Sequence, residues 1–572
     1  MIPRTRHRYA AVSRRKADGA TYTPAVLAEF VAKQIASAVH ADRDRELRVL
    51  DPAVGDGVLL TSLVRALHER GCERISVTGF DTNPAALDEA RQRFAREFPD
   101  LAPTLQQRDF LDDARCTEPF DAVIANPPYV RTQVLGAQRA QQLARRYGLT
   151  GRVDLYYAFL LAISRVLAPG ATLGIIVSNR FMSTRSGQSV RKALHELYNL
   201  IHVWDLGDTK LFDAAVLPAV LLAGTKDAAD LGTRFTSIYE TTKESSQAAR
   251  SPIEALHLDG IVTTADGRRF DVVQGSLDTT GVWRMATAEK DEWLALVQSR
   301  TFARFGDLGK IRVGVKTTAD KVFIRDDWSE LARNILPEVL RPLTTHHLAR
   351  RYRALADAST QILYTHESRD GRRVAIDLAR YPRTRAYLEG HRAQLERRQY
   401  VIAAGRQWYE IWVPQDPSAW SRPKLVFPDI SAEPVFWIDE TGSVVNGDCY
   451  WLTLEPGRDA DLMWLALAVG NSRFALEFYD HRFNNRLYAH RRRFITQYVS
   501  EFPLPDPALP VSREIIALAK QIYRSIPAED ADSLARTVDA RVHEAFGLAA
   551  HSDSAWKSHS ATVRTPDTAS VY

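Results

Sequence analysis

The chain has 572 residues, of which 45% are hydrophobic and 25% are charged. This is the composition of an ordinary globular protein, and the length suits about two to four domains. The three cysteines lie far apart and form no CxxC pair, which excludes a disulfide framework and a cysteine-rich zinc site and fits a reducing cytoplasm. No apolar run reaches the roughly 18 residues of a spanning helix, so we expect no membrane partner. The net charge of +5 alone barely favours an anionic partner.

The first 18 residues form a basic arm with six lysine or arginine side chains and one acidic residue, Asp18. No apolar segment of the kind that a secretory signal requires follows it. We expect a disordered or phosphate-contacting arm. An organellar transit peptide, which shares the acid-poor character, is the alternative.

From Leu47 to about Lys226, short β-rich runs alternate with amphipathic helical stretches, the pattern of a mostly parallel sheet covered by helices. The expected strands are 47–50, 75–80, 105–108, 122–125, 172–177, 201–206 and 218–224. Only about a dozen residues without helical periodicity separate the last two strands, so we expect an antiparallel hairpin that closes the sheet. The sequence therefore predicts an α/β domain over residues 19–228.

Acidic side chains follow three successive predicted strands. Asp51 opens the segment Asp51-Pro-Ala-Val-Gly-Asp-Gly57, Asp81 ends the second strand, and Asp109 with Phe110 follows the third. Glycines let the backbone approach a ligand, a carboxylate can accept both hydroxyls of a ribose, and an aromatic ring suits adenine. The GxxxxGK[ST] and GxGxxG patterns are absent, which disfavours ATP and NAD. We expect a cofactor cradle at this sheet edge, although aspartate also ends strands and caps helices.

The fourth strand runs directly into Asn126-Pro127-Pro128-Tyr129. Two prolines fix the backbone and remove two N–H donors, which leaves the Pro127 carbonyl and the Asn126 amide oxygen as rigid acceptors. Two acceptors suit an NH2 group, and Tyr129 can stack on the ring that bears it, so that the nitrogen lone pair faces an electrophile. By chance, Asn-Pro-Pro-aromatic would occur in ~0.5% of chains of this length. A proline-stiffened turn without a function is the alternative.

These segments resemble the gamma-class amino-methyltransferases of restriction-modification systems, the TaqI-type adenine methylases. The resemblance covers most of the chain. It implies a Rossmann-like class I methyltransferase core, which is a mostly parallel seven-stranded sheet with a terminal hairpin, and a C-terminal mixed α+β target-recognition domain. Asn126, Pro127, Pro128 and Tyr129 match the family's catalytic motif without deviation. Phe212 matches the aromatic residue that stacks on the flipped base, and without the resemblance it would be a core residue of the hairpin.

The resemblance further implies S-adenosylmethionine as the cofactor and no metal. Gly19-Ala-Thr-Tyr-Thr-Pro24 resembles the family's N-terminal cofactor motif, and residues 51–57 resemble its S-adenosylmethionine loop. In that loop the family more often has Cys at Val54 and Ser at Asp56, a departure that we expect to be tolerated because these positions act chiefly through the backbone. The implied cofactor-binding residues are Tyr22, Thr23, Pro24, Asp51, Pro52, Ala53, Gly55, Gly57, Asp81, Asp109 and Phe110.

After residue 228 the sequence becomes aromatic-rich and irregular, and we place a second domain at 229–510. Residues 341–410 carry 14 arginines against seven acidic residues, and no acid lies between His481 and Val499. Arginine side chains bind phosphates, and arginine and asparagine side chains can form hydrogen bonds with base edges. A solvated helical face without a ligand has the same composition and is the alternative. The expected DNA-binding residues are Arg351, Arg353, Arg383, Arg385, Lys424, Arg482, Asn485, Arg486 and Arg491.

The end of the chain divides into three segments. Residues 500–507 are predicted to be an extended linker, 511–550 to be helical, and 551–572 to be a disordered tail.

The sequence thus predicts a cytoplasmic, prokaryotic, site-specific enzyme that transfers a methyl group from S-adenosylmethionine to N6 of a flipped adenine in double-stranded DNA. A separate restriction endonuclease is a candidate partner. Three alternatives stay open. One is a methyltransferase on a release-factor glutamine or an RNA guanine amine, which presents the same NH2 group. The others are a cytosine-N4 target and a non-catalytic DNA-binding subunit of a defence complex. We expect no fused nuclease, because the sequence has no convincing carboxylate–lysine set of that kind.

Overall fold

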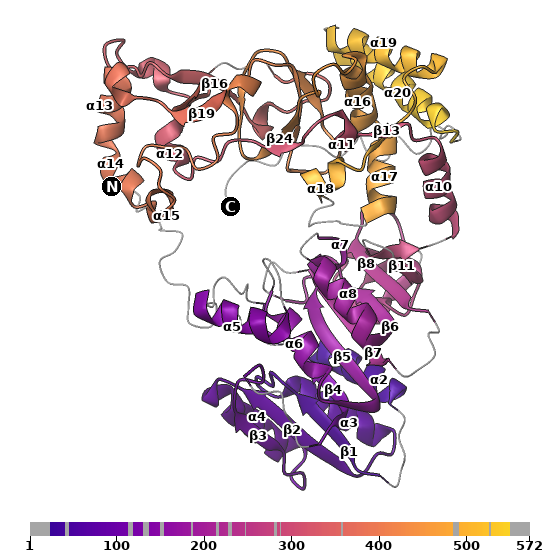
Figure 1. Cartoon of the computed structure of the whole chain (residues 1–572). Helices are drawn as coiled ribbons and strands as arrows, with labels where there is room; N and C mark the ends of the chain where they lie inside the picture. The colour runs from indigo at the N-terminus through magenta and orange to yellow at the C-terminus, as the bar shows by residue number, and fades with distance from the viewer. Residues whose placement is uncertain are drawn as a thin grey trace. The chain divides into compact units, whose positions relative to one another are not determined.

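The structure is a computed structural model of the whole chain. It describes residues 23–39, 45–112, 118–129, 137–148, 154–184, 187–212, 217–226, 232–245, 247–279, 283–286, 288–355, 359–483, 491–524 and 528–548. The chain forms two compact units. Unit 1 comprises residues 1–288 with 486–490, and unit 2 comprises residues 289–485 with 491–572 (Figure 1). The basic arm and the predicted tail lie outside the described residues.

Unit 1 is built on a sheet whose first seven strands have the order β3-β2-β1-β4-β5-β7-β6. Strands β3, β2, β1, β4 and β5 are parallel to one another, and β7 is antiparallel to both β5 and β6. The predicted hairpin is therefore confirmed. The strands are β1 (Leu47–Asp51), β2 (Ile75–Asp81), β3 (Thr104–Gln107), β4 (Phe120–Ala125), β5 (Leu167–Ser178), β6 (Tyr198–Asp205) and β7 (Pro218–Thr225).

The hairpin does not close the sheet, because β8 pairs with β6 in parallel and the order continues as β8-β11-β10-β9, with β12 on β11. These strands are β8 (Arg234–Glu240), β9 (Gln247–Ala249), β10 (Gly260–Thr264), β11 (Arg269–Asp278) and β12 (Arg284–Ala286). The first compact unit consequently ends at Ala288 and not at the expected 228. Backbone pairing to β6 joins residues 234–286 to the first sheet, and a change in sequence pattern does not reveal such pairing.

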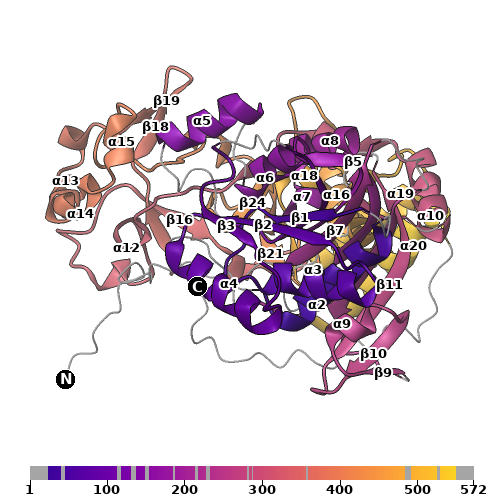
Figure 2. The same cartoon turned by 90° about the horizontal axis from the view of Figure 1, so that it is seen from below.

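Helices cover both faces of the sheet. Figure 2 shows α2, α3 and α4 on one side of β1, β2 and β3, and α6 and α8 on the other. Two hydrophobic cores correspond to these faces, and successive residues of β4 alternate between them: Ala122 and Ile124 enter the first, and Val123 and Ala125 enter the second. The helices are α2 (Ala25–Ala38), α3 (Val58–Glu69), α4 (Pro84–Glu97), α5 (Ala137–Tyr147), α6 (Tyr156–Ile163), α7 (Arg180–Ser183), α8 (Gln188–Leu197) and α9 (Pro252–Ala255).

Local sequence explains where these helices begin, end and pack. Asn83 caps α4 by accepting a hydrogen bond from the Ala85 N–H, and Pro84 occupies the first turn. Gly174 of β5 allows α2 to lie close to the sheet, because a Cβ at this position would stand 2.6 Å from Ile35 and 3.0 Å from Val31. This close approach fixes the position of α2 over the centre of the sheet.

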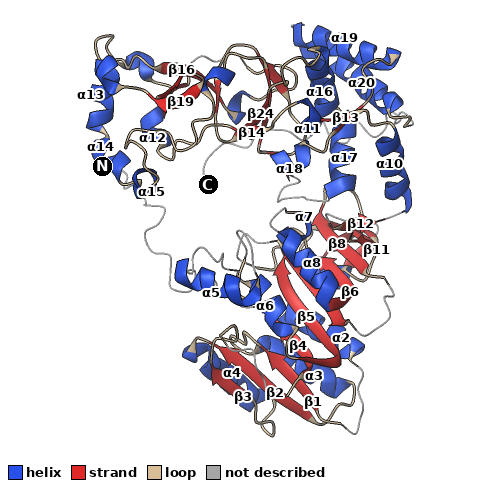
Figure 3. Ribbon diagram, in the orientation of Figure 1, coloured by secondary structure: helices blue, strands red, loops and turns tan. Residues whose placement is uncertain are grey.

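Unit 2 combines helices with short strands (Figure 3), and two hydrophobic cores lie on the two faces of β20 (Lys424–Pro428). Leu425 and Phe427 face a helical core, whereas Val426 faces a core rich in tryptophan. The helices of unit 2 are α10 (Ala288–Ser299), α11 (Phe305–Leu308), α12 (Asp320–Phe323), α13 (Pro382–Gly390), α14 (Arg392–Glu396), α15 (Gln399–Ala403), α16 (Asp461–Asn471), α17 (Arg473–Phe483), α18 (Thr496–Val499), α19 (Pro510–Arg524) and α20 (Ala528–Ala545).

The strands of unit 2 form short sheets, two of them four-stranded, with the orders β14-β24-β20-β22 and β15-β17-β16-β23. The strands are β13 (Ala303–Arg304), β14 (Arg312–Val313), β15 (Ile324–Arg325), β16 (Leu340–Thr344), β17 (Gln361–Leu363), β18 (His366–Arg369), β19 (Arg372–Ala375), β20 (Lys424–Pro428), β21 (Ile430–Ser431), β22 (Trp437–Asp439), β23 (Val444–Val445), β24 (Cys449–Leu452), β25 (Arg492–Arg493) and β26 (Pro503–Leu504).

The segment 500–507 is extended but is not a linker. Its strand β26 pairs with β13, and Phe502 and Leu504 are fully buried in the helical core of unit 2. Burial of two large apolar side chains ties this segment to the domain, and each contributes about 1.5–3 kcal/mol. The segment 511–550, which was expected to be helical, carries α19 and α20, and their buried residues join the same core. Within the described ranges, no helix is long and apolar enough to cross a membrane.

Candidate active site

The ends of β2, β1 and β4 lie side by side at one edge of the sheet. Asp51, the last residue of β1, is in register with Gly79 of β2, two residues before Asp81. On the other side of β1, Leu50 is in register with Val123 of β4, so Asn126 follows the end of the neighbouring strand. Because these strands are parallel, their carboxyl ends meet at the same edge. The structure thus brings the predicted cofactor loop and the Asn-Pro-Pro-Tyr segment together.

The loop 52–57 is held by backbone hydrogen bonds to the end of β2. The Gly55 N–H donates to Asp81 Oδ2 at 2.9 Å, and the Val54 N–H donates to the Phe80 carbonyl at 2.9 Å. Gly57 has a φ of +81°, and a Cβ there would lie 3.0 Å from Ala90 Cβ of α4. Gly55 has a φ of +53° and open space where a Cβ would stand. The first glycine leaves room beside the loop, and the second permits the turn into α3.

Asp51 is a carboxyl group with no exposed surface. Its Oδ1 accepts a hydrogen bond from the Ala53 N–H at 2.9 Å, while Oδ2 is buried without a hydrogen-bond partner in the part of the chain that the structure describes. Burial, together with the nearby Asp81 and Asp56, raises the pKa of Asp51 to about 8, although the hydrogen bond from the Ala53 N–H opposes the shift. A buried acid with an unused oxygen suits a cationic group of a ligand.

Asp56, where the resembled family more often has serine, is neutralised by α4. Arg93 donates to Asp56 Oδ2 at 2.7 Å and to the Asp56 carbonyl at 3.0 Å, and Asp56 Oδ1 accepts from the Val58 N–H at the start of α3. The departure is therefore accommodated through the side chain, which accepts a hydrogen bond from the first residue of α3 and pairs with an arginine, and not through the backbone alone.

Asp109 lies beyond β3 and is already engaged by α5. Its Oδ1 accepts from the Leu111 N–H, and Arg139 bridges the carboxylates of Asp109 and Asp112. Phe110 is 2% exposed, and its ring stacks between Phe80 and Phe159 at centroid distances of 6.0 and 6.1 Å. Phe110 is thus a core residue, and its contact with the adenine of a cofactor stays a prediction.

Asn126 is held by Thr23, a contact between residues 103 positions apart in the sequence. The amide nitrogen Nδ2 donates to the Thr23 hydroxyl at 3.0 Å. Pro24, the next residue, precedes the first turn of α2 and accepts the hydrogen bonds of Leu27 and Ala28. Tyr22 lies outside the described residues, so its predicted role is not placed.

The rest of the Asn-Pro-Pro-Tyr segment is partly covered. Pro127 is buried, while Pro128 and Tyr129 are half-buried. The Tyr129 hydroxyl is buried without a hydrogen-bond partner among the described residues, and burial raises the pKa of Tyr129 above its usual value. Tyr129 is therefore a neutral phenol with an apolar ring, which suits stacking.

Phe212 lies in the segment between β6 and β7 and is 8% exposed. It belongs to the hydrophobic core that includes Leu206 and Val220. This placement agrees with the alternative in which Phe212 is a core residue of the hairpin. Stacking on a flipped base stays a prediction, and it requires the ring to leave this core.

The predicted DNA-binding residues of unit 2 have different surroundings. Arg385 and Arg491 are exposed, and Arg353 is exposed with its guanidinium 5.9 Å from the Tyr523 ring. Arg351 pairs with Glu433 at 2.6 Å, and Arg383 pairs with Glu338 at 3.1 Å. Arg482 is half-buried at the end of α17. Asn485 and Arg486 lie outside the described residues.

Lys424 was expected to contact DNA, and the structure contradicts this. Its side chain has no exposed surface, and Nζ lies 2.8 Å from Asp439 Oδ2 and donates to the Trp420 carbonyl at 2.8 Å. Burial lowers the pKa of Lys424, and the Asp439 carboxylate opposes that shift. Lys424 is a structural residue of β20 because its charge is satisfied inside the domain.

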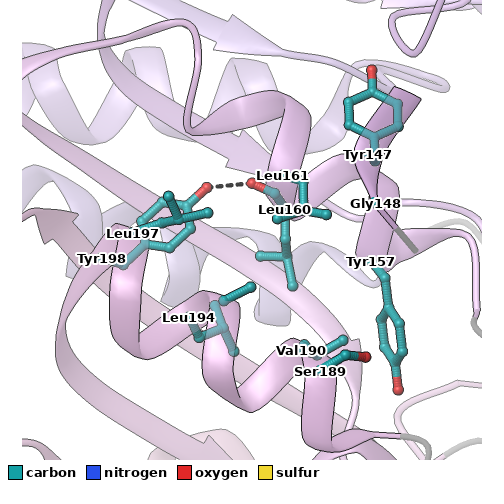
Figure 4. A pocket seen from close by; sticks show the side chains of 11 residues that line it. Tyr147, Gly148, Tyr157, Leu160, Leu161, Ser189, Val190, Leu194, Leu197 and Tyr198 are labelled. Atoms are coloured by element: carbon teal, nitrogen blue, oxygen red, sulfur yellow. Dashed lines mark hydrogen bonds between the residues drawn. The ribbon is translucent and has the colours of Figure 1, made fainter. Parts of the chain in front are cut away.

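A cavity of about 120 Å³ lies on the face of unit 1 that carries α6 and α8. Leu160, Leu161, Leu194 and Tyr198 are among its lining residues, and the Tyr198 hydroxyl donates to the Leu160 carbonyl (Figure 4). None of the predicted site residues lines it. Among the described residues, no group of three His, Cys, Asp or Glu side chains is placed to hold a metal ion.

Comparison with known proteins decides the family. The model of the Eco57I restriction-modification methylase family matches residues 66–212. M.BanIII, a type II methyltransferase of Aneurinibacillus aneurinilyticus, is 39% identical over 553 residues, which cover 90% of this chain and 94% of the relative. The chain belongs to the type II methyltransferases of restriction-modification systems. M.BstVI, a type II methyltransferase of Geobacillus stearothermophilus, is 25% identical over 545 residues, which cover 88% of this chain and 91% of the relative.

The solved DrdV–DNA complex shares the fold of this type II methyltransferase. The TM-score is 0.52 at 13% identity, over 89% of this chain and 57% of that chain. S-adenosylmethionine is the cofactor of the methyltransferase family to which the chain belongs. Three features fit a cationic nucleoside cofactor of this kind: the carboxylate of Asp81, the space beside Gly55, and the buried Asp51 oxygen that has no hydrogen-bond partner among the described residues.

Proposed function

We propose that this type II methyltransferase acts on the N6 amine of an adenine that is flipped out of double-stranded DNA, as the gamma-class adenine methylases do. The observation that carries the proposal is the placement of Asn126 at the end of β4, next to the loop between β1 and α3, with its amide held by Thr23. A duplex base must leave the stack before its amine can reach a buried reactive centre.

The residues of the chain prepare the amine chiefly by positioning it. The Asn126 amide oxygen and the Pro127 carbonyl would accept its two N–H groups, and the ring of Tyr129 would stack on the base. The bound cofactor supplies a methyl group on a cationic sulfonium, which is a good leaving group. No general base is needed beforehand, because the proton can leave the amine after transfer. We assign most of the catalytic effect of the site to this positioning of the amine.

Asp51, Asp81 and the loop between them would hold the cofactor. We assign the unused oxygen of Asp51 to a cationic group, Asp81 to the ribose hydroxyls and Asp109 to the adenine amine. Asp81 and Asp109 already accept protein hydrogen bonds. Each carboxylate oxygen has two lone pairs, so both residues can accept further bonds.

Two observations favour DNA over a protein or RNA acceptor. The likeness to M.BanIII extends over 90% of the chain and so includes unit 2, for which a release-factor methylase has no evident use. The solved relative with the same fold over 89% of the chain is a complex with DNA. The intact cofactor cradle argues against a non-catalytic DNA-binding subunit. Asn126 favours adenine over cytosine-N4, because the cytosine members of the resembled family more often begin the motif with serine.

The test is methyl transfer in solution with tritiated S-adenosylmethionine and mixed-sequence duplex DNA. We expect label in N6-methyladenine after hydrolysis to nucleosides. Asn126→Ala should lower the rate by at least about 10³-fold, because both the acceptor and the positioning of the amine are lost, while cofactor affinity changes less than about threefold. Label in N4-methylcytosine, or label only when a peptide or an RNA is offered, would show that the acceptor is a different one. An active Asn126→Ala enzyme would show that the mechanism is wrong.

A further inference from the structure

The hydroxyl of Thr23 contacts the Asn126 side chain and lies in a buried environment. Thr23 is 8% exposed and immediately precedes Pro24 and α2. Its Oγ1 accepts the hydrogen bond from Asn126 Nδ2 at 3.0 Å. The family resemblance assigns Thr23 to the cofactor, so a contact with the residue that would hold the acceptor base is a different role.

The packing of α2 on the sheet of unit 1 places Thr23 next to Asn126. Gly174 of β5 is in register with Ile124 of β4, two residues before Asn126. Because Gly174 has no side chain, Ile35 and Val31 of α2 pack onto the sheet at this row. Helix α2 is buried along this face through Leu27, Ala28, Phe30 and other apolar residues. A rigid helix thus carries Thr23 to the end of β4, and the hydroxyl does not depend on a loose loop for its position.

The orientation of the Asn126 amide decides which group it offers to a substrate. A terminal amide rotates between two arrangements that exchange oxygen and nitrogen. With Nδ2 directed at Thr23, the carbonyl oxygen occupies the other side of the amide. The opposite arrangement would present an NH2 donor to the NH2 of a substrate, and two donors repel. The hydrogen bond that Nδ2 donates also polarises the amide and makes its oxygen a better acceptor.

We propose that Thr23 is a positioning residue of the reaction, which holds the Asn126 amide with its oxygen available to the amine of the acceptor base. This rests on the proposed function in one respect, namely that Asn126 accepts a hydrogen bond from that amine. Thr23 itself touches no reacting atom. Its effect is therefore expected on the rate of methyl transfer and not on the affinity for the cofactor.

The first experiment compares Thr23→Val, which keeps the shape and removes the hydroxyl, with Thr23→Ser, which keeps the hydroxyl. Single-turnover methyl transfer to DNA is measured at saturating S-adenosylmethionine, and the dissociation constant of the cofactor is measured by titration calorimetry. We expect Thr23→Val to slow transfer about tenfold or more, with a cofactor dissociation constant within twofold of the wild type, and Thr23→Ser to stay within about threefold in rate. Thr172→Val, at a buried threonine of β5, is the matched control and should transfer at the wild-type rate.

Two results would overturn the inference. If Thr23→Val transfers methyl groups as fast as the wild type, the contact has no role in the reaction. If Thr23→Val weakens cofactor binding while the rate at saturation is unchanged, Thr23 serves the cofactor and not Asn126.

A second measurement separates this inference from the proposed function, because it needs neither DNA nor cofactor. The protein is labelled with ¹⁵N-asparagine, and the Nδ2 resonances of Asn126 are assigned by their loss in Asn126→Ala. Thr23→Val should shift these resonances, and Thr23→Ser should restore them. If the wild type methylates no adenine yet Thr23→Val shifts the signals, the acceptor is wrong and the Thr23–Asn126 contact stands. Unshifted signals in Thr23→Val overturn the contact, whatever base is methylated.

Discussion

Asp51 combines complete burial, an oxygen without a described partner and a pKa raised to about 8. At pH 7 the carboxyl group of the cofactor-free protein is therefore mostly protonated. Partnership with a cationic ligand group would favour the carboxylate and release that proton. A contact between Asp51 and the cofactor would thus link cofactor binding to pH, in addition to the bond that Asp51 accepts from the Ala53 N–H in the loop.

The prediction is that affinity for S-adenosylmethionine rises with pH. The slope should approach tenfold per pH unit below pH 8 and flatten above it, because binding requires deprotonation of a group whose free pKa is about 8. Calorimetry at pH 7 in buffers of different ionisation enthalpy should register close to one proton released. Asp51→Asn should bind more weakly and lose the slope. A flat profile in the wild type would mean that Asp51 does not pair with the cofactor.

Asp56 and Asn126 show which parts of the site the sequence reveals and which it does not. An acid inside the loop, where the resembled family more often has serine, calls for a cation, but nothing local singles out Arg93 of α4 as its partner. Likewise, the Asn-Pro-Pro-Tyr segment is recognisable from its composition, whereas its contact with Thr23 depends on the packing of α2 against Gly174. These segments were recognisable because their composition is local information, whereas their contact partners were not predictable, because those partners come from distant segments.

At the scale of elements, helix α5 docks on the segment that follows β3. Arg139 bridges Asp109 and Asp112, Arg146 donates to the Leu111 carbonyl, and the Tyr147 hydroxyl donates to the same oxygen at 3.0 Å. Burial is the largest single influence on Arg139 and lowers its pKa, but the hydrogen bonds and charges of Asp112 and Asp109 together outweigh burial and raise the pKa of Arg139. Helix α5 follows the Asn-Pro-Pro-Tyr segment in the chain, so its docking ties the predicted adenine-binding segment to the polypeptide that leaves the catalytic motif.

Arg139→Ala should loosen the docking of α5 while it lowers the free energy of unfolding of the protein only slightly. The side chains of Arg139, Asp109 and Asp112 are 26%, 31% and 59% exposed, and pairs this accessible contribute about 1 kcal/mol or less. We expect faster hydrogen–deuterium exchange in residues 137–147, with exchange in α3 unchanged as the internal control. Equal exchange of α5 in both proteins would show that the two ion pairs do not hold the helix.

The strands of unit 1 were predictable and its boundary was not. The seven strands predicted from β-rich runs all exist, with ends that shift by a few residues, because buried parallel strands are short continuous apolar segments between turn residues. Residues 234–286 were assigned to the second domain because the α/β alternation stops there. Their membership of the first sheet depends on the parallel pairing of β8 with β6, a long-range contact that follows no helix crossover of the expected kind.

At the scale of the whole molecule, the basic side chains of unit 2 fall into two groups, one buried and paired and the other exposed. Some basic side chains, such as Lys424 and Arg492, are buried and paired with Asp439 and Asp480. Others, such as Arg385 and Arg491, are exposed. Composition alone cannot distinguish these groups, which is why Lys424 was wrongly assigned to DNA. We propose that the exposed arginines supply the phosphate contacts of a DNA-binding unit.

Binding to a DNA duplex at several salt concentrations tests this division. Arg385→Ala and Arg491→Ala should each reduce the slope of log K against log salt by about 1. Lys424→Met should leave that slope unchanged. It should instead lower the free energy of unfolding by about 3 kcal/mol, because it leaves the Asp439 carboxylate buried without its partner. A reduced slope in Lys424→Met, together with wild-type slopes in both arginine variants, would reverse the assignment.

The most direct test of the central claim, that Asn126 presents an adenine amine for methylation, is a map of modified bases in the DNA of cells that express the protein. We predict N6-methyladenine at one recurring short sequence, and its complete absence when Asn126→Ala is expressed at the same level. Modification of cytosine in place of adenine, or an unchanged adenine signal in Asn126→Ala cells, would contradict the account.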